Sequence, residues 1–172
     1  VTTYAYNDEH GDVLFEVLRG PDKTFRQRCP DGKGGTCWTT TGVRRVLYRL
    51  PELMEAVRAG RTIYIAEGEK DVDALVRAGE AATCNPMGAG KWAQVAGQAQ
   101  TLLAGSNVVI VADKDTAGRK HAADIVASLT RQAATITVVE AVHGTDPPEH
   151  LGRGPCVADF TLPEAETLET AQ

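Results

Sequence analysis

Two aspartates stand one residue apart, directly after a run of apolar residues. The segment NVVIVADKDTAGRKHA begins at Asn107, and Asp113 and Asp115 follow its apolar run Val108–Ala112. Side chains alternate along an extended chain, so both carboxylates point to one side if the strand geometry persists through Lys114. Carboxylates packed together raise one another's pKa unless a cation is present. Because Mg²⁺ and Mn²⁺ prefer such oxygen ligands, the pair is a candidate metal site.

Further carboxylates follow the neighbouring predicted strands. Glu67 comes after the predicted strand Thr62–Ala66, and Asp146 follows the predicted strand Thr135–Val139. Asp71 lies four residues after Glu67, about one helical turn further on the same side. Ligands of parallel sheets bind outside the carboxyl ends of the strands. Three strand ends would therefore deliver carboxylates to one edge, which suits metal-assisted phosphoryl or nucleotidyl transfer.

A simpler structural role is open to one of these acids. Asp115 precedes Thr116 and is well placed to cap the helix predicted to begin there. Capping explains a single acid and leaves the acids at the other strand ends unexplained. His143 lies near Asp146 and could act as an acid or base, although a lone histidine in a loop is more often incidental.

Cationic residues are concentrated upstream of the acids. Residues 19–49 contain eight basic and two acidic side chains, a local charge of +6 in a chain whose formal net charge is −5. Such a segment is either a solvated face or a surface that binds a polyanion. Together with cations near the acids, the candidates for holding polynucleotide or triphosphate are Arg26, Arg28, Arg44, Arg45, Lys91, Arg119 and Lys120.

The glycine-rich loop NPMGAGKW, residues 85–92, lies between a predicted strand and a predicted helix. It lacks the first glycine and the final Ser or Thr of a P-loop. Its GAGKWA part fits G-x-G-x-x-A, with Asp113 about 20 residues later, as a dinucleotide site favours. However, the glycines do not follow the strand directly, and the acids at the other strand ends would have no role. The loop either carries Lys91 toward phosphates or is an ordinary turn with a solvated lysine.

Residues 1–60 are predicted to form a small, basic, β-rich subdomain. The strand candidates Thr3–Tyr6 and Val13–Leu18 flank a turn-rich segment, which is a hairpin signal. Residues 23–27 are a third strand candidate, and a helix is expected from Pro51 to Gly60. For the aromatic residues of this region, Trp38 and Tyr48, packing in a small core is favoured over stacking on bases.

Residues 61–151 alternate predicted strands and helices, which is typical of an α/β fold with a mostly parallel sheet flanked by helices. Gly118 stands early in a predicted helix, where glycine costs about 1 kcal/mol against alanine, so a close approach of the backbone to the sheet or to a ligand is expected there. Residues 152–172 are expected to form a flexible tail. The elements predicted between the acids are the strands Ala81–Cys84 and Val108–Ala112, the helices Lys70–Ala78, Trp92–Leu103 and Thr116–Arg131, and the short helix Pro148–Leu151.

The composition is that of an ordinary globular protein, with 42% hydrophobic and 24% charged residues. No apolar run approaches the roughly 20 residues of a membrane helix, and no signal peptide opens the chain. A cytoplasmic location without membrane contact is therefore expected. The four cysteines lack zinc-finger spacing and are expected to be reduced thiols. The chain begins at Val1 and is expected to be a piece of a larger protein.

Several segments resemble a known family. IYIAEGEKDVDAL and VVIVADKDTAGRKHA resemble the two signature segments of the Toprim domain, a glutamate after one strand and Asp-x-Asp after a later one. This domain occurs in DnaG-type primases, topoisomerases, OLD-family nucleases and recombination proteins. The combination of EGEKD, NPMGAGKW, DKDTAGRKHA and GTDPPEHL, with FRQRCPDGKGG and GVRRVLYRLPEL upstream, most resembles primases of phages, plasmids and integrated elements. The resemblance extends to about Leu151.

The resemblance implies roles for the acids. Glu67 would be the catalytic acid, and Asp71 matches the aspartate of the primase EGxxD motif. Asp146 matches the first aspartate of the primase D-P-D segment, but Pro148 stands where the second would be, which puts a third metal-binding position in doubt. The implied metal ligands are Asp71, Asp113, Asp115 and Asp146.

The leading interpretation is a primase catalytic core that joins ribonucleoside triphosphates on a single-stranded DNA template with Mg²⁺ or Mn²⁺. It would act in the replication of a mobile element, with a replicative helicase as a partner. Two alternatives remain open. A metal-dependent Toprim nuclease of the OLD kind would use the same acids to activate water. A nucleic-acid-binding module would keep the fold without the chemistry, which the proline at position 148 permits.

Overall fold

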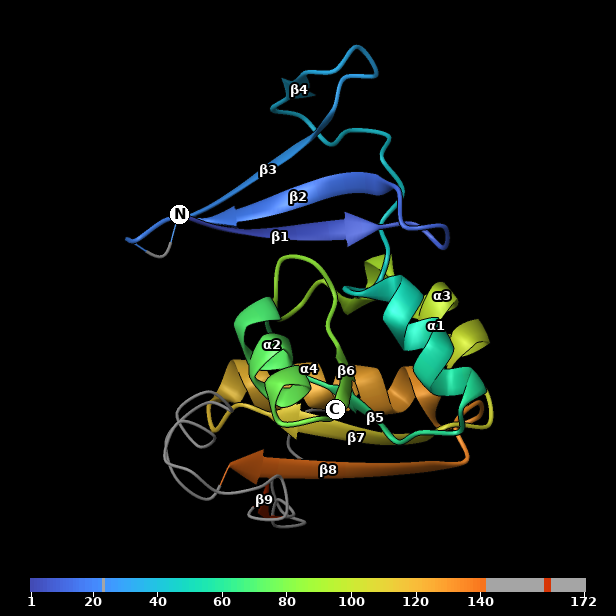
Figure 1. Cartoon of the computed structure of the whole chain (residues 1–172). Helices are drawn as coiled ribbons and strands as arrows, with labels where there is room; N and C mark the ends of the chain where they lie inside the picture. The colour runs from blue at the N-terminus through green and yellow to red at the C-terminus, as the bar shows by residue number, and fades with distance from the viewer. Residues whose placement is uncertain (23, 142–159, 162–172) are drawn as a thin grey trace.

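Two sheets form the scaffold of the molecule. The computed structural model describes residues 1–22, 24–141 and 160–161. An antiparallel sheet from the N-terminal strands lies against a mostly parallel sheet with helices (Figure 1). The predicted α/β fold with a small β-rich N-terminal part is thus confirmed. Within the described ranges, no helix is both long and apolar enough to cross a membrane.

The N-terminal sheet presents one apolar face to the rest of the molecule. Its four strands are β1 (Thr2–Asn7), β2 (Val13–Arg19), β3 (Phe25–Pro30) and β4 (Thr36–Cys37). They pair antiparallel in the order β1-β2-β3-β4. Alternate side chains of β1 and β2 are buried, as the period of two along a strand requires. Tyr6 stacks on Phe15 with ring centroids 4.6 Å apart, which gives this face its aromatic centre.

The second sheet contains the strands predicted from the apolar runs. Its strands are β5 (Ile63–Ile65), β6 (Ala81–Thr83), β7 (Asn107–Ala112), β8 (Thr135–Ala141) and β9 (Phe160–Thr161). The order is β6-β5-β7-β8-β9, with β5 to β8 parallel and β9 antiparallel to β8. Strand β9 lies within the segment expected to be a tail, and the helix predicted at Pro148–Leu151 lies outside the described residues. The division into residues 1–60, 61–151 and 152–172 stays a prediction.

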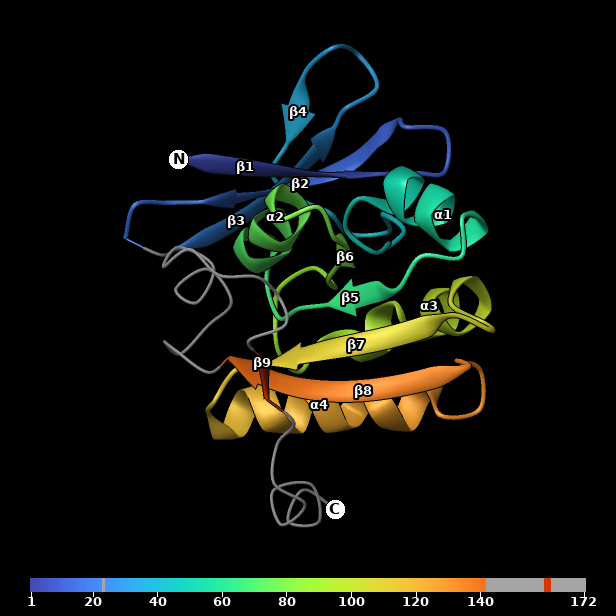
Figure 2. The same cartoon turned by 60° about the horizontal axis from the view of Figure 1, so that its bottom comes forward.

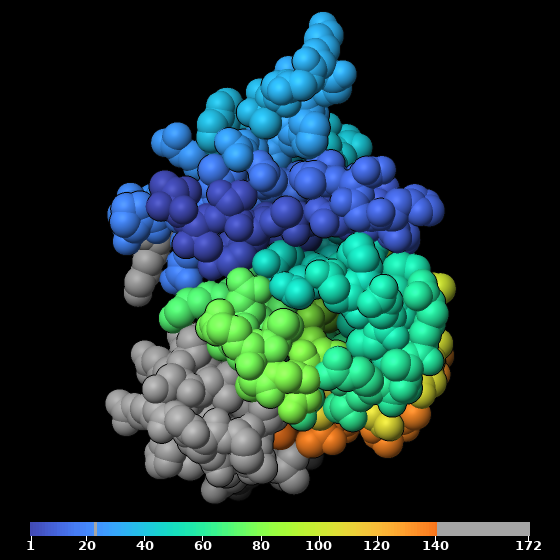
Figure 3. Space-filling view, viewed as in Figure 1, coloured from blue at the N-terminus to red at the C-terminus, as the bar shows by residue number. Residues whose placement is uncertain are grey.

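Both faces of the parallel sheet are covered. The helices are α1 (Leu50–Arg58), α2 (Glu69–Arg77), α3 (Ala96–Leu102) and α4 (Thr116–Leu129). Val108 and Ile110 of β7 pack with α3 and α4, whereas Val109 and Val111 face α2 and the N-terminal sheet. Figure 2 shows α4 on one side of the sheet, and α2 and the N-terminal strands on the other. Figure 3 shows the blue N-terminal strands resting on the green segments that include α1 and α2. The central strand β7 is therefore covered on both sides, which explains its continuous apolar run.

The prediction of one continuous helix over Trp92–Leu103 is wrong. A 3₁₀ turn, η1 (Trp92–Gln94), is followed by α3, and Val95 between them has φ −123° and ψ −1°. Tertiary packing accounts for the break, because Trp92 and Val95 are both buried in the core. The indole Nε1 of Trp92 also donates to Ser128 Oγ at 2.7 Å, which ties this turn to α4. Packing of a large aromatic side chain here overrides local helix propensity.

Gly118 provides the close approach that its early position in a helix predicts. A Cβ at this position would lie 2.7 Å from the carbonyl oxygen of Asp113 and 2.8 Å from the Asp113 Cβ. The first turn of α4 therefore packs directly on the end of β7, where only glycine fits. This contact sets the position of the Asp113 backbone.

We expect Gly118→Ala to lower the free energy of unfolding by about 1–3 kcal/mol, the usual cost of overpacking a close-packed site. The added methyl group meets backbone that cannot move without shifting β7 or α4. Urea denaturation measures the effect. Gly97→Ala in α3 is the control, because a Cβ there meets nothing within 4 Å. Equal stabilities of the two variants would contradict this account.

Candidate active site

Three of the candidate acids line one cavity beneath the N-terminal sheet. Parallel pairing sets Ile65 of β5 opposite Ile110 of β7, so both strands end at the same edge. Glu67 and Asp113 follow these ends and both line a cavity of about 360 Å³. Asp71, in the first turn of α2, lines it as well. The expected convergence of carboxylates on one edge is therefore present for these three acids.

Glu67 is held in a position that penalises its negative charge. Its Oε2 is buried and has no hydrogen-bond partner among the described residues. Burial raises the pKa of Glu67, and the negative charge of Asp115 raises it further. The Asp115 carboxylate is therefore close enough to Glu67 to interact with it electrostatically. A cation between such groups would relieve the cost.

Asp115 is the N-cap of α4. Its Oδ1 accepts a hydrogen bond from the backbone N–H of Gly118 at 2.7 Å, so the capping role is confirmed. The cap holds the Asp-x-Asp segment against the first turn of the helix, where the helix dipole also favours a carboxylate. Asp115 is exposed, and it is not among the residues that line the cavity. At the end of β7, Asp113 therefore lines the cavity, whereas one carboxylate oxygen of Asp115 caps α4.

The oxygen donors fit a hydrated divalent ion better than a fully enclosed one. Within the described ranges, no three acidic, histidine or cysteine side chains are gathered to hold one metal ion. Mg²⁺ is usually held by one or two carboxylates and keeps water or phosphate oxygens as its other ligands. Glu67, Asp71 and Asp113 around one cavity suit that mode. Asp146, His143 and Pro148 lie outside the described residues, so the position that the proline puts in doubt is untested.

The glycine-rich loop after β6 forms another wall of the cavity. Asn85 is buried, and its Nδ2 donates to the carbonyl oxygens of Pro86 at 3.1 Å and Gly88 at 2.8 Å. Met87 has φ +67°, a left-handed conformation that is uncommon for a residue other than glycine. Residues 87–89 line the cavity. Lys91 is exposed and is not among the lining residues, so the loop itself is closer to the acids than its lysine is.

Most of the candidate nucleic-acid ligands already have partners within the protein. Arg28 pairs with Glu16, and Arg45 lies over the Phe15 ring at 4.8 Å and donates to Thr40. Arg26 and Lys91 are exposed. The other pairs are Arg44 with Glu9, Arg119 with Glu140 and Lys120 with Asp124. These ion pairs neutralise much of the local positive charge in the folded protein.

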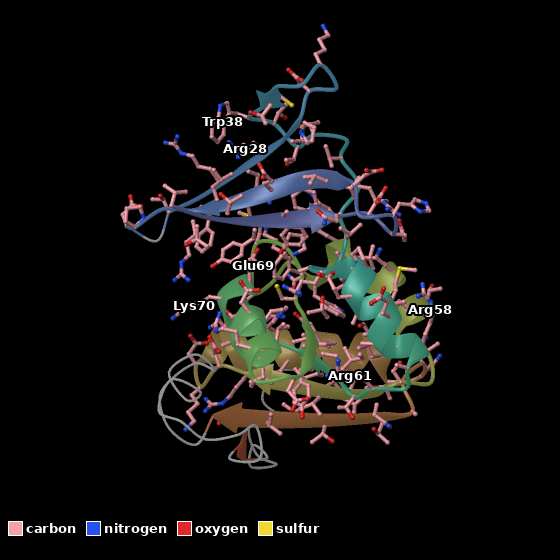
Figure 4. All side chains as sticks on the ribbon, in the orientation of Figure 1. Arg28, Trp38, Arg58, Arg61, Glu69 and Lys70 are labelled. Carbon is pink, nitrogen blue, oxygen red and sulfur yellow. The ribbon has the colours of Figure 1, made fainter. Side chains whose placement is uncertain are left out.

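The alternation of β3 places two of the cations away from the cavity. Arg26 and Arg28 pair with Leu18 and Glu16, whereas Gln27 pairs with the buried Val17. The two arginines therefore lie on the outer face of the N-terminal sheet. Figure 4 shows Arg28 above β1 and β2, and Glu69 and Lys70 below these strands. Glu69 and Lys70 line the cavity.

The aromatic residues of the N-terminal region behave differently from one another. Tyr48 is buried, with ring centroids 6.0 Å from Tyr4 and 5.2 Å from Tyr6, so the preference for core packing is confirmed. Trp38 is 62% exposed, so the prediction of core packing is wrong for this residue. Figure 4 shows it above β1 and β2, on the side away from α2.

A buried hydrogen bond joins the N-terminal sheet to the acidic edge. The Tyr6 hydroxyl donates to Glu69 Oε1 at 2.7 Å, and both side chains are buried. Burial raises the pKa of Glu69, while the hydrogen bond from Tyr6 opposes that rise. Sequence reasoning missed this pair, and also Arg19, Phe25 and Lys70, which line the cavity. The sequence signals were the position of Glu69 and Lys70 inside EGEKD and that of Arg19 at the start of the basic segment.

Comparison with protein families identifies the α/β part. Residues 61–140 match the family model of the Toprim domain. This segment runs from the residues before β5 to the end of β8, and it contains Glu67, Asp71, Asp113 and Asp115. Residues 61–140 therefore form a Toprim domain. A comparison with curated proteins gave no match.

Solved structures share the fold over most of the chain. The E. coli primase catalytic core matches with a TM-score of 0.65 at 20% identity, covering 98% of this chain and 51% of that chain. A DnaG primase catalytic domain bound to single-stranded DNA matches with a TM-score of 0.64 at 20% identity, covering 98% of this chain and 52% of that chain. The primase fragment of the bacteriophage T7 primase-helicase protein matches with a TM-score of 0.63 at 19% identity, covering 88% of this chain and 57% of that chain. The chain has the fold of these primase catalytic cores and spans about half of their length.

We expect Tyr6→Phe to lower the free energy of unfolding by about 1–3 kcal/mol, because it leaves a buried carboxyl oxygen of Glu69 without its donor. Urea denaturation measures the loss. Tyr64→Phe is the control, since it removes a half-buried hydroxyl that hydrogen-bonds to no described residue. In a double-mutant cycle with Glu69→Leu, which removes the acceptor, strictly additive effects would contradict a coupled pair.

The Glu9–Arg44 pair predicts a pH dependence of stability. Two hydrogen bonds from Arg44 lower the pKa of Glu9 from its ordinary 4.5 to about 2. The ionised Glu9 therefore contributes its full stabilisation above the pKa that it has in the unfolded chain. This contribution is lost as the pH falls from about 5 toward 2. Glu9→Gln should flatten the stability profile over this range, by less than about 1 kcal/mol because the pair is exposed.

Urea denaturation at pH 7 and pH 3 tests this dependence on Glu9. The control is Glu55→Gln, which changes an exposed glutamate of α1. If wild type and Glu9→Gln differed equally at both pH values, the ion pair would not be the cause.

Proposed function

We propose that this chain is the catalytic part of a DNA primase, a nucleotidyltransferase that joins ribonucleoside triphosphates on a single-stranded DNA template. The observation that carries the proposal is the cavity lined by Glu67, Asp71 and Asp113 beneath the N-terminal sheet. Acids at this edge of a Toprim domain, within the fold of primase catalytic cores, suit nucleotidyl transfer.

In this proposal a divalent ion, Mg²⁺ or Mn²⁺, supplies positive charge for the phosphates of the incoming nucleotide. Asp113 and Asp115 would hold it, with Asp71 and Asp146 as further ligands. Glu67 would act as the catalytic acid–base group at the reacting hydroxyl. Its raised pKa makes the ionised carboxylate a stronger proton acceptor than an ordinary surface glutamate.

The cations would hold the phosphates of template, primer or triphosphate. Arg26 and Lys91 are exposed and available, whereas Arg28, Arg44, Arg119 and Lys120 would exchange their carboxylate partners for phosphate. Arg45 would contribute its charge from its position on the Phe15 ring. A primase domain of phage T7 was solved with an RNA/DNA hybrid, and a DnaG catalytic domain with single-stranded DNA, which supports these partner classes.

The setting of the enzyme is also a proposal. The sequence segments that resemble primases of phages, plasmids and integrated elements favour replication of a mobile element. A helicase partner is supported by the T7 neighbour, which is a primase-helicase protein. In this view, residues 1–60 form the basic subdomain that guides nucleic acid, and residues 61–151 form the catalytic unit.

We expect Glu67→Gln and Asp113→Asn each to reduce primer synthesis at least about 100-fold, the usual contribution of an acid–base or metal-holding group. The measurement is incorporation of labelled ribonucleotides on single-stranded DNA with Mg²⁺ or Mn²⁺. Glu55→Gln, on the exposed face of α1, is the matched control and should keep wild-type activity. Full activity after Asp113→Ala combined with Asp115→Ala would refute the proposal.

The same preparation separates synthesis from cleavage. Plasmid incubated with metal and without nucleotides should stay intact if the chain is a primase. Cleavage that requires Glu67 and Asp113 would instead assign the site to a nuclease. Nucleic-acid binding with neither reaction would assign the chain to a non-catalytic module.

A further inference from the structure

Two exposed apolar side chains line the same cavity as the acids. Among the described residues, Phe25 is 46% and Met87 is 45% exposed, although large apolar side chains are usually buried. They come from distant parts of the chain, the start of β3 and the loop after β6, and both line the cavity that Glu67 and Asp113 line. Exposed apolar surface beside a cluster of acids indicates a ligand with an apolar part.

The fold holds Phe25 at the cavity. In the antiparallel pairing of β2 with β3, Phe25 is opposite Arg19, and the Arg19 guanidinium carbon lies 5.7 Å from the centroid of the Phe25 ring. Both residues belong to the face of the sheet that carries the buried Phe15 and Val17, which is the face turned toward the Toprim domain. A cation over an aromatic ring is attracted to it, so Arg19 helps to hold the ring in place.

Met87 is held there by a strained loop. Its φ of +67° is costly for a residue with a side chain, and such strain persists only when the surroundings over-determine it. Asn85 provides that support, because its buried side chain donates to two carbonyl groups of the loop. The loop thereby keeps an apolar side chain at the cavity, at a conformational cost that core packing does not explain.

The cavity also has a polar lining. Glu67, Asp71 and Asp113 contribute to it, together with Lys70 at the start of α2. A volume of about 360 Å³ is large enough for a planar ring system with part of its sugar. A molecule with a planar apolar ring at one end and a chain of phosphates at the other matches both the apolar and the polar lining residues.

We propose that Phe25 and Met87 contact the nucleobase of the incoming ribonucleoside triphosphate and thereby position it for reaction at the acidic edge. This inference rests on the proposed function and names two positioning residues for it. The base packs on Phe25 and against Met87, and the phosphates extend toward Lys70 and the acids. Because every base offers an aromatic face, this contact favours nucleotides over inorganic polyphosphate without selecting one base.

Steady-state kinetics test the positioning role of Phe25. Phe25→Leu should raise the KM for ribonucleoside triphosphate about tenfold, which corresponds to about 1.4 kcal/mol, and should change kcat less than about twofold. Phe25→Trp should keep the wild-type KM, because its ring also stacks. Val13→Ala is the control, since Val13 is similarly exposed at the far end of β2 and does not line the cavity. An unchanged KM in Phe25→Leu would overturn the proposal.

A binding measurement tests the same contact without catalysis. In a Trp38→Phe background, which removes the other exposed indole, the fluorescence introduced by Phe25→Trp should be quenched by ATP with Mg²⁺. Inorganic triphosphate should not quench it. Quenching by a single-stranded oligonucleotide but not by ATP would overturn the proposal and assign the surface to polynucleotide.

The outcomes separate this inference from the proposed function. If the wild type makes primer and Phe25→Leu leaves the KM for ribonucleoside triphosphate unchanged, the base contact is refuted and the primase proposal is not. Quenching by ATP in a protein whose wild type makes no primer would support the base contact and refute the primase proposal. Met87→Ala provides a second variant, with the expected rise in KM in the same direction.

Discussion

The parallel pairing of β5 with β7 is the constraint on which the rest of the structure depends. It brings the carboxyl ends of two strands, separated by about 40 residues of chain, to one edge, so that Glu67 and Asp113 line the same cavity. Both strands contribute side chains to the two apolar clusters on either face of the sheet, so apolar packing resists their relative displacement. The close contact of Gly118 with Asp113 fixes the end of β7 against α4 in the same way. Hydrophobic burial thereby provides the rigid base for groups that repel one another.

The N-terminal sheet is a second layer of the site rather than a separate attachment. Its aromatic face belongs to the same apolar cluster as residues of α2 and of the parallel sheet. The buried hydrogen bond between Tyr6 and Glu69 fixes this layer next to the helix that begins after Glu67. The layer also brings Arg19 and Phe25 to the cavity, so its inner face contributes chemistry different from that of the arginines on its outer face.

Ion pairs within the protein make the basic segment less positive than its sequence indicates. The local excess of positive charge in the sequence is partly cancelled by Glu9 and Glu16, which come from before and within β2. Exposed ion pairs contribute little to stability, so a polyanion can replace the carboxylates at small cost. The basic segment is therefore compatible with nucleic-acid binding while being less positive in the folded protein than its composition indicates.

Much of the α/β fold could be predicted from the sequence, because apolar periodicity and turn residues are local signals. The four parallel strands, the helices α2 and α4 and the capping role of Asp115 are examples. The break at Val95 could not be predicted, because it results from packing of Trp92 against α4. The exposure of Trp38 likewise depends on which surfaces meet, and not on residue type.

By itself, the sequence determined which acids stand at strand ends, and it determined the need for glycine at position 118. Both follow from chain-local rules, since a strand's length and alternation decide where its last polar residues point. Only the tertiary structure decided what faces those acids. Phe25, Arg19 and Met87 reach the cavity through cross-strand pairing and a strained loop, contacts between segments far apart in the chain. No periodic pattern encodes such contacts, because they depend on how the two sheets pack against each other.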